Sequence, residues 1–261
     1  MKISFNKIFL FVFLIILCIF LVTIGKQKEN LPDFCQGDKR FGEFPGNGKA
    51  FCGPTSVSNI LIYLNRHGFP KLFPADDKTQ ASQFKLIKLL SSEDYMDTKF
   101  NKGTEPFELI KGLEKYVIEH GYKISIKWNG WHDGGNYSSG EIPTVQWMKD
   151  QIKSNHNIIF HLGWYKYDPL KNVYKRTGGH YVTVVAVKDD LIVIHDPAIR
   201  SGVNPKDENC RLVLLKSGAI SEWKNYSERS AKGYLKLDGI KLREGSGCAI
   251  VDGVIAFKIY K

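Results

Sequence analysis

The chain has 261 residues, of which 43% are hydrophobic, and a formal net charge of +10. About 235 residues follow the first 26, which is enough for one compact domain with a sizeable core, so we expect one domain and a monomer. The lysines are scattered, and no nucleic-acid-binding motif accompanies them. The charge therefore indicates a soluble, lysine-rich surface and no nucleic-acid partner.

The N-terminal residues have the pattern of an export signal or a membrane anchor. Residues 1–7 are basic, and residues 8–25 are uncharged and rich in Phe, Ile, Leu and Val. Such a run is near the lower limit for a membrane-spanning helix and longer than the usual signal-peptide core. Thr23 and Gly25 allow cleavage before Lys26 but do not require it. We expect a signal peptide or membrane anchor over residues 1–25, a linker over 26–34, and a domain over 35–261. This domain would be secreted, or anchored on the extracytoplasmic side of a membrane if the segment is not cleaved.

A buried amphipathic helix is predicted directly after Cys52. Val57, Ile60, Leu61 and Leu64 recur at helical spacing and form one apolar face. Cys52 stands at the start of this helix, where the positive end of the helix dipole stabilises a thiolate. The alternative is a small, inert cysteine buried at a helix start.

The middle of the chain alternates between predicted helices and strands. The strongest of these helices covers residues 105–120, where Phe107, Ile110, Leu113 and Val117 share one face and Gly121 ends the helix. The other predicted elements are helices over residues 83–90 and 145–153, strands over 122–128, 157–164 and 249–259, a surface loop over 130–143 and a polar turn over 168–179.

Residues 178–197 predict a β-hairpin, because two β-branched runs flank the polar residues 188–190. With a three-residue loop, His180 and Asp196 fall on one face as diagonal neighbours, with α-carbons roughly 7–8 Å apart, and His195 points away. With a two-residue loop the register shifts by one residue, and Asp196 moves to the opposite face. The relation between His180 and Asp196 therefore depends on the turn.

Cys52, His180 and Asp196 are the residue types that nucleophilic catalysis needs: a nucleophile, a base and an acceptor that orients the base. Each has a structural alternative as well. A histidine in a strand often bonds to backbone, and Asp-Pro often ends a strand. Their joint presence favours the catalytic interpretation.

The remaining cysteines are Cys35, Cys210 and Cys248, besides Cys18 in the leader. Outside the cytoplasm a disulfide is plausible, and we expect Cys210 to pair with Cys248 because both lie in the C-terminal third, although connectivity cannot be read from sequence. The chain has no CxxC pair and no HExxH motif, so we expect no metal site and no cofactor.

Four motifs in order carry a family resemblance: Cys-Gly-Pro-Thr-Ser at 52–56, Gly-Thr at 103–104, Gly-Gly-His-Tyr-Val at 178–182 and His-Asp-Pro at 195–197. Over about residues 36–198 the chain resembles papain-fold cysteine peptidases of the bacteriocin-processing, double-glycine peptidase-like branch. The resemblance implies an α+β, papain-like fold, in which an N-terminal helical part bearing the nucleophile packs on an antiparallel β-sheet. It also implies a catalytic triad of Cys52, His180 and Asp196.

Two features depart from the family pattern. The family has a glutamine a few residues before the cysteine, which helps to hold the oxyanion, whereas Pro45, Gly46 and Asn47 stand at that spacing here. We prefer Gln36, which would serve if residues 37–51 loop out, over the shorter Asn47. Members that trim double-glycine leaders are commonly fused to a transporter, and because nothing here resembles one, that substrate is not carried over.

The sequence thus favours an exported or membrane-anchored thiol hydrolase that acts on peptide or amide bonds of a peptide or protein substrate through an acyl-enzyme. The alternatives are a catalytically silent papain-fold binding module and an acyltransferase with the same triad.

Overall fold

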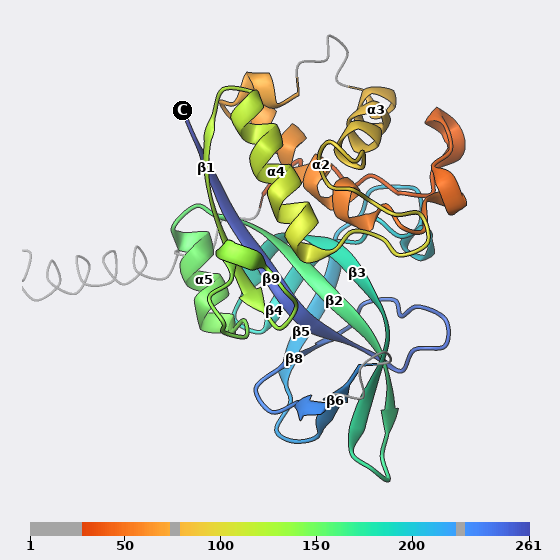
Figure 1. Cartoon of the computed structure of the whole chain (residues 1–261). Coiled ribbons are helices and arrows are strands. Elements are labelled where there is room, and N and C mark those ends of the chain that lie inside the picture. The colour runs from red at the N-terminus through yellow and green to blue at the C-terminus, as the bar shows by residue number, and fades with distance from the viewer. Residues whose placement is uncertain (1–27, 74–78, 223–227) are drawn as a thin grey trace, which may run out of the picture.

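The computed structural model describes residues 28–73, 79–222 and 228–261. Helices α2 (Cys52–Arg66), α3 (Gln80–Leu90) and α4 (Pro106–Glu119) lie together on one side of a curved β-sheet (Figure 1). A further helix, α5 (Val145–Lys153), lies apart from them and contacts β2 and β3. The short 3₁₀ helices are η1 (Lys39–Phe41), η2 (Pro45–Gly48), η3 (Pro70–Leu72), η4 (Gly135–Tyr137) and η5 (Ile199–Ser201).

Nine strands form one sheet in the described part of the chain. They are β1 (Lys123–Gly130), β2 (Asn157–Asp168), β3 (Val173–Lys188), β4 (Leu191–His195), β5 (Glu208–Leu214), β6 (Ala219–Ser221), β7 (Glu228–Ser230), β8 (Leu235–Asp238) and β9 (Cys248–Tyr260). The strand order is β1-β9-β8-β5-β4-β3-β6-β7, and β2 pairs with both β3 and β9. Because β2 joins β3 to β9, strands β2, β3, β4, β5, β8 and β9 close into a barrel.

The α+β class and the antiparallel sheet are as predicted, apart from one parallel pair between β3 and β6. The closure of the sheet was not predicted. The closure depends on β9, which pairs along β2 and also pairs with β8 through Ile250 and Lys236. These contacts lie far apart in the chain, and hydrophobic alternation within a strand does not identify its partner.

The described residues form four apolar clusters, and the two largest make up most of the core. One lies between the helices and the sheet and includes Val57, Ile60 and Leu61, all fully buried, which confirms the predicted inner face of α2. The other takes residues from all six barrel strands and Met148 from α5, so it fills the barrel. The helix that carries Cys52 is therefore fixed on a rigid barrel.

The β3–β4 hairpin differs from both registers considered for it. Lys188 pairs with Leu191, which leaves Asp189 and Asp190 as a two-residue turn, and Asp189 has a positive φ of 55°. The register then shifts between Val184 and Ala186, and beyond this bulge Thr183 pairs with His195. The bulge adds one residue to β3 and restores, near Asp196, the register of the three-residue loop.

Most predicted elements are confirmed to within a few residues, and α5 has the predicted bounds. The polar turn over residues 168–179 was wrong, because β3 begins at Val173. Tyr165–Asp168 and Val173–Arg176 pair as an arm that continues beyond the barrel. Several of its residues are partly exposed, so the arm is polar and has no apolar pattern to identify it.

Residues 28–34, the described part of the predicted linker, pack against the rest of the domain. In residues 28–34, the Lys28 backbone N–H donates to Val185 O at 3.4 Å, and Leu31 and Phe34 are buried. The predicted signal peptide or anchor over residues 1–25 lies outside the described residues. Among the described residues, no helix is both long and apolar enough to cross a membrane.

Candidate active site

Cys52 is the first residue of α2 and is buried. Pro54 lies in the first turn, where a backbone N–H has no intrahelical acceptor, so the missing donor costs the helix nothing. The Thr55 hydroxyl donates to Phe51 O at 2.7 Å and fixes the entry of the chain into the helix. The sequence thus places a thiol at the positive end of a helix.

Two hydrogen bonds join the start of α2 and the loop before α4 to strand β3. The Thr183 hydroxyl donates to Ser56 O at 3.1 Å, and the Tyr181 hydroxyl donates to Thr104 O at 3.1 Å. Gly53 faces the same loop and α4, because a Cβ at this position would lie 3.3 Å from Thr104 Oγ1 and 2.8 Å from Leu109 Cδ1. Cys52 is therefore held directly beside the part of β3 that carries His180.

His180 and Asp196 lie together, as the three-residue register predicted. His180 Nε2 is 2.6 Å from Asp196 Oδ1, and both side chains are buried. Because Nε2 faces the carboxylate, Nδ1 is the ring nitrogen left for the Cys52 thiol. The structure thus brings Cys52, His180 and Asp196 into one connected group.

The electrostatics of this group favour a charged thiol and a charged imidazole. Burial raises the pKa of Cys52, but the charge and hydrogen bond of His180 outweigh it and lower the pKa below its usual 9.0. Burial lowers the pKa of His180, but Asp196 and Cys52 outweigh it and raise the pKa to about 8. Each charge therefore stabilises the other.

Asp196 is held ionised by several donors. It accepts hydrogen bonds from Arg200 Nη2 at 2.7 Å and from the Ala198 backbone N–H at 3.0 Å, in addition to His180. Burial raises the pKa of Asp196, but His180, Arg200 and the Ala198 N–H outweigh it and lower the pKa to about 2. A fixed carboxylate of this kind sets the orientation of the imidazole.

Arg200 and Trp164 also belong to this group and were not predicted from the sequence. The Trp164 ring stacks on His180 with ring centroids 5.6 Å apart, and the Arg200 guanidinium carbon lies 4.6 Å from the centroid of the Trp164 ring. The available signal for Arg200 was its position four residues after Asp196. Trp164 had no signal beyond its place in an apolar strand, because its pairing with β3 is a tertiary property.

Gln36 is linked through Gly48 to the residue before the nucleophile, whereas the Asn47 side chain bonds to Lys39. Gln36 Nε2 donates to Gly48 O at 2.8 Å, and the same oxygen accepts the N–H of Phe51, the residue before Cys52. Gly48 has a φ of +74°, and a Cβ there would lie 1.9 Å from Gln36 O, so only glycine fits. Asn47 is exposed, and its Oδ1 accepts from Lys39 Nζ at 3.0 Å.

Cys210 and Cys248 are free thiols in the structure, so the predicted disulfide is absent. Cys210 is buried in the barrel core on β5, whereas Cys248 packs in a separate cluster at the start of β9. Shared location in the C-terminal third was a poor guide, because the two strands carry these residues to different cores.

We expected no metal site, but one cluster contains metal-ligand residue types. The ligand atoms of His132, His161 and Asp252 lie within 4.8 Å of one another. Asp252 already accepts hydrogen bonds from Arg176 Nε at 2.7 Å and from the Tyr165 hydroxyl at 2.6 Å. Because the fixed positive charge of Arg176 opposes a metal cation at this carboxylate, we interpret the cluster as a buried ion-pair network.

The helix-borne cysteine beside a histidine and an aspartate on a β-barrel defines the papain-fold cysteine peptidases as the class. The chain belongs to the Peptidase_C39 like family, whose model matches residues 26–230. This confirms the resemblance to the bacteriocin-processing type and extends it beyond residues 36–198. No curated protein matches the chain.

Proposed function

We propose that the protein is a cysteine peptidase in which Cys52, His180 and Asp196 form the catalytic triad. The observation that carries the proposal is the position of His180. Its Nε2 lies 2.6 Å from Asp196 Oδ1, and its charge and hydrogen bond lower the pKa of the Cys52 thiol. The family is one of peptidases, which supports a peptide or protein as the substrate.

In the proposed mechanism, the Cys52 thiolate attacks the carbonyl carbon of the scissile bond and protonated His180 gives its proton to the leaving amine. Asp196 holds the imidazole and stabilises its positive charge, as the aspartate of a catalytic triad does. Water, deprotonated by His180, then attacks the thioester and releases the acid product with the thiol. The Cys52 backbone N–H and the second N–H of the Gln36 amide are the proposed donors to the oxyanion.

The test is hydrolysis of a mixed peptide library by residues 26–261, with Cys52→Ala as the inactive variant and Cys35→Ser as the matched control. Cys35 is also a buried free thiol, but burial raises its pKa, so its loss should leave hydrolysis unchanged. We expect the native chain and the Cys35→Ser variant to cleave the library, and the Cys52→Ala variant to be inactive. Equal activity in Cys52→Ala would overturn the proposal.

The same experiment distinguishes a peptidase from the two alternatives, an acyltransferase and a catalytically silent binding module. A product joined to an added amine, in place of the free acid, would identify an acyltransferase. A stable, folded chain without turnover and with a Cys52 reactivity like that of free cysteine would identify a silent binding module.

We also propose that the protein acts outside the cytoplasm, either secreted or anchored in the membrane. The support is the basic start at residues 1–7 and the apolar run at residues 8–25. Fractionation of cells that produce the full chain, followed by N-terminal sequencing of the product, tests the location and whether the segment is removed. Recovery of an intact chain in the cytoplasmic fraction would contradict it.

A further inference from the structure

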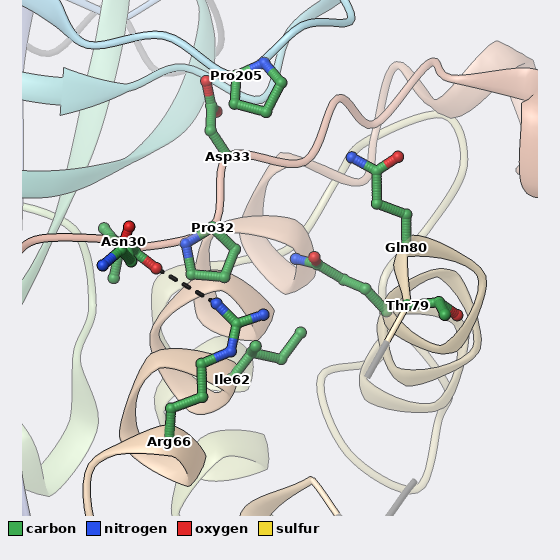
Figure 2. A pocket seen from close by; sticks show the side chains of 10 residues that line it. Asn30, Pro32, Asp33, Ile62, Arg66, Thr79, Gln80 and Pro205 are labelled. Atoms are coloured by element: carbon green, nitrogen blue, oxygen red, sulfur yellow. Dashed lines mark hydrogen bonds between the residues drawn. The ribbon is translucent and has the colours of Figure 1, made fainter. Parts of the chain in front are cut away.

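A cavity with both polar and apolar lining residues lies away from the proposed catalytic group, at the far end of α2 from Cys52. It has a volume of about 270 Å³ and is bounded by α2, the start of α3, residues 30–33 and Pro205 (Figure 2). Ile62 and Arg66 line it from α2, and Gln80 and Gln83 line it from α3. A cavity of this size is small compared with the sites of drug-sized ligands, so its occupant would be a small molecule.

Asp33 supplies a negative charge at one end of the cavity. Its Oδ2 accepts the Lys206 backbone N–H at 3.0 Å, and its Oδ1 has no donor among the described residues. Burial raises the pKa of Asp33 to about 6, against the opposing effect of His195. The carboxylate is therefore poorly compensated, and a ligand cation would stabilise it.

Arg66 supplies a positive charge at the other end (Figure 2). Its Nη1 donates to Asn30 O over a long 3.4 Å, and within the described ranges it forms no ion pair with a carboxylate. A guanidinium has five N–H donors in a planar fork that fits a carboxylate, and most of these remain available.

The wall between the two charges offers amide groups. Gln83 is buried, and its Nε2 donates to Ser58 Oγ at 3.0 Å and to Asn59 Oδ1 at 2.7 Å. Both amide hydrogens are thus used, which fixes the side chain and leaves Oε1 as an acceptor. Gln80 extends from the start of α3 on the same side (Figure 2).

We propose that this cavity binds a short zwitterionic peptide with both ends free. Its ammonium group would lie against Asp33, its carboxylate against Arg66, and a backbone N–H of the ligand would donate to Gln83 Oε1. Two opposite charges that form no ion pair within the described ranges, both lining one small cavity, match this class of molecule and neither a simple cation nor a simple anion.

The probe is L-alanyl-L-alanine, titrated calorimetrically at pH 7.5 into residues 26–261 carrying Cys52→Ala. This background prevents cleavage of the probe, so binding is measured whether or not the chain is a peptidase. We expect one saturable site. N-acetylation or C-amidation of the dipeptide should each weaken binding about tenfold or more, because each removes a charge-assisted hydrogen bond. Glycine and L-alanyl-L-alanyl-L-alanine distinguish a free amino acid from a longer peptide as the occupant.

On the protein side, Asp33→Asn and Arg66→Gln should each weaken binding by a similar factor. The matched controls are Asp190→Asn and Arg211→Gln, which change an exposed ion pair of 2.8 Å and should leave binding unchanged. No binding up to about 10 mM would overturn the proposal, since even a small ligand with two charged contacts should bind in the millimolar range. Equal binding of the end-blocked dipeptides would overturn it as well, and this arm needs no variant beyond the Cys52→Ala background.

Discussion

At the scale of single residues, the site depends on how one carboxylate is held. Asp196 receives donors from three directions: the His180 ring, the Arg200 guanidinium and the Ala198 backbone N–H. With both oxygens bonded, the carboxylate cannot rotate away from the imidazole. The negative charge that it keeps down to about pH 2 is what raises the pKa of His180.

The two shifted pKa values predict a bell-shaped pH profile. The thiolate–imidazolium pair forms as the pH rises through the lowered pKa of Cys52, and it is lost as His180 deprotonates near pH 8. We therefore expect kcat/KM to fall above about pH 8. The Asp196→Asn variant should move this basic limb to lower pH, because the charge that raises the pKa of His180 is gone. A basic limb that stays in place in Asp196→Asn would contradict the assignment.

Gln36 and Asn47 should differ in their effect on the rate. Loss of an oxyanion donor typically lowers kcat by about 100–1,000-fold, so we expect a loss of this size in Gln36→Ala. Asn47→Ala is the matched control and should retain full kcat, because its side chain is at the surface and bonds to Lys39. Steady-state kinetics on one peptide substrate measures both. An equal loss in the two variants would contradict the role of Gln36.

Some of the residues of the candidate site could be predicted from the sequence and others could not. Cys52, His180 and Asp196 were predictable, because a helix start and a hairpin are local patterns that restrict where their side chains point. Gln36 was predicted only through the family resemblance, since nothing in residues 37–51 says that they loop out. Arg200 and Trp164 were missed, because their role arises from stacking between separate elements.

At the scale of elements, the β3–β4 hairpin shows how a local irregularity sets the geometry of the proposed triad. Its two-residue turn alone would place Asp196 on the wrong face. The bulge at Val185 shifts the register back by one residue, so the turn and the bulge together give the pairing of Thr183 with His195. The sequence left the relation between His180 and Asp196 open between two loop lengths. The structure has the register of the three-residue loop near Asp196, reached through a two-residue turn and a bulge.

Deletion of Val185 should therefore abolish the site while leaving a hairpin. Without the bulge, the two-residue turn imposes the other register, and Asp196 moves away from His180. We expect the selective alkylation of Cys52 by iodoacetamide at pH 6 to disappear, as followed by mass spectrometry. Val185→Ala keeps the bulge and is the matched control: it should lose about 1–3 kcal/mol of stability but keep the alkylation. Selective labelling that survives the deletion would show that the bulge does not set the register.

At the scale of the whole molecule, the part of the chain that the structure describes is stabilised by its apolar cores and a closed barrel, and its four cysteines are free thiols. Burial raises the pKa of Cys210 to about 12 and that of Cys248 to about 11, so both thiols are protonated at neutral pH. The closure itself could not be predicted, because β9 pairs with strands that lie more than 80 residues earlier, such as Tyr165 with Cys248.

The melting temperature should therefore not depend on reducing agent. We expect the same midpoint with and without dithiothreitol in a thermal unfolding scan of the purified chain. Labelling of Cys210 should require denaturant, because its thiol is buried in the barrel. A midpoint that falls by several degrees on reduction would indicate a disulfide in the protein as isolated.

The late position of β9 has a consequence for biosynthesis. Both β1 and β2 pair with β9, so neither has its full set of hydrogen bonds while the ribosome is still translating residues 248–260. All three members of the triad emerge earlier, but β2, which supports His180 from behind, is not yet locked in place. The strand that pairs with β3 at His180 therefore gains its full set of hydrogen bonds only when translation is nearly complete.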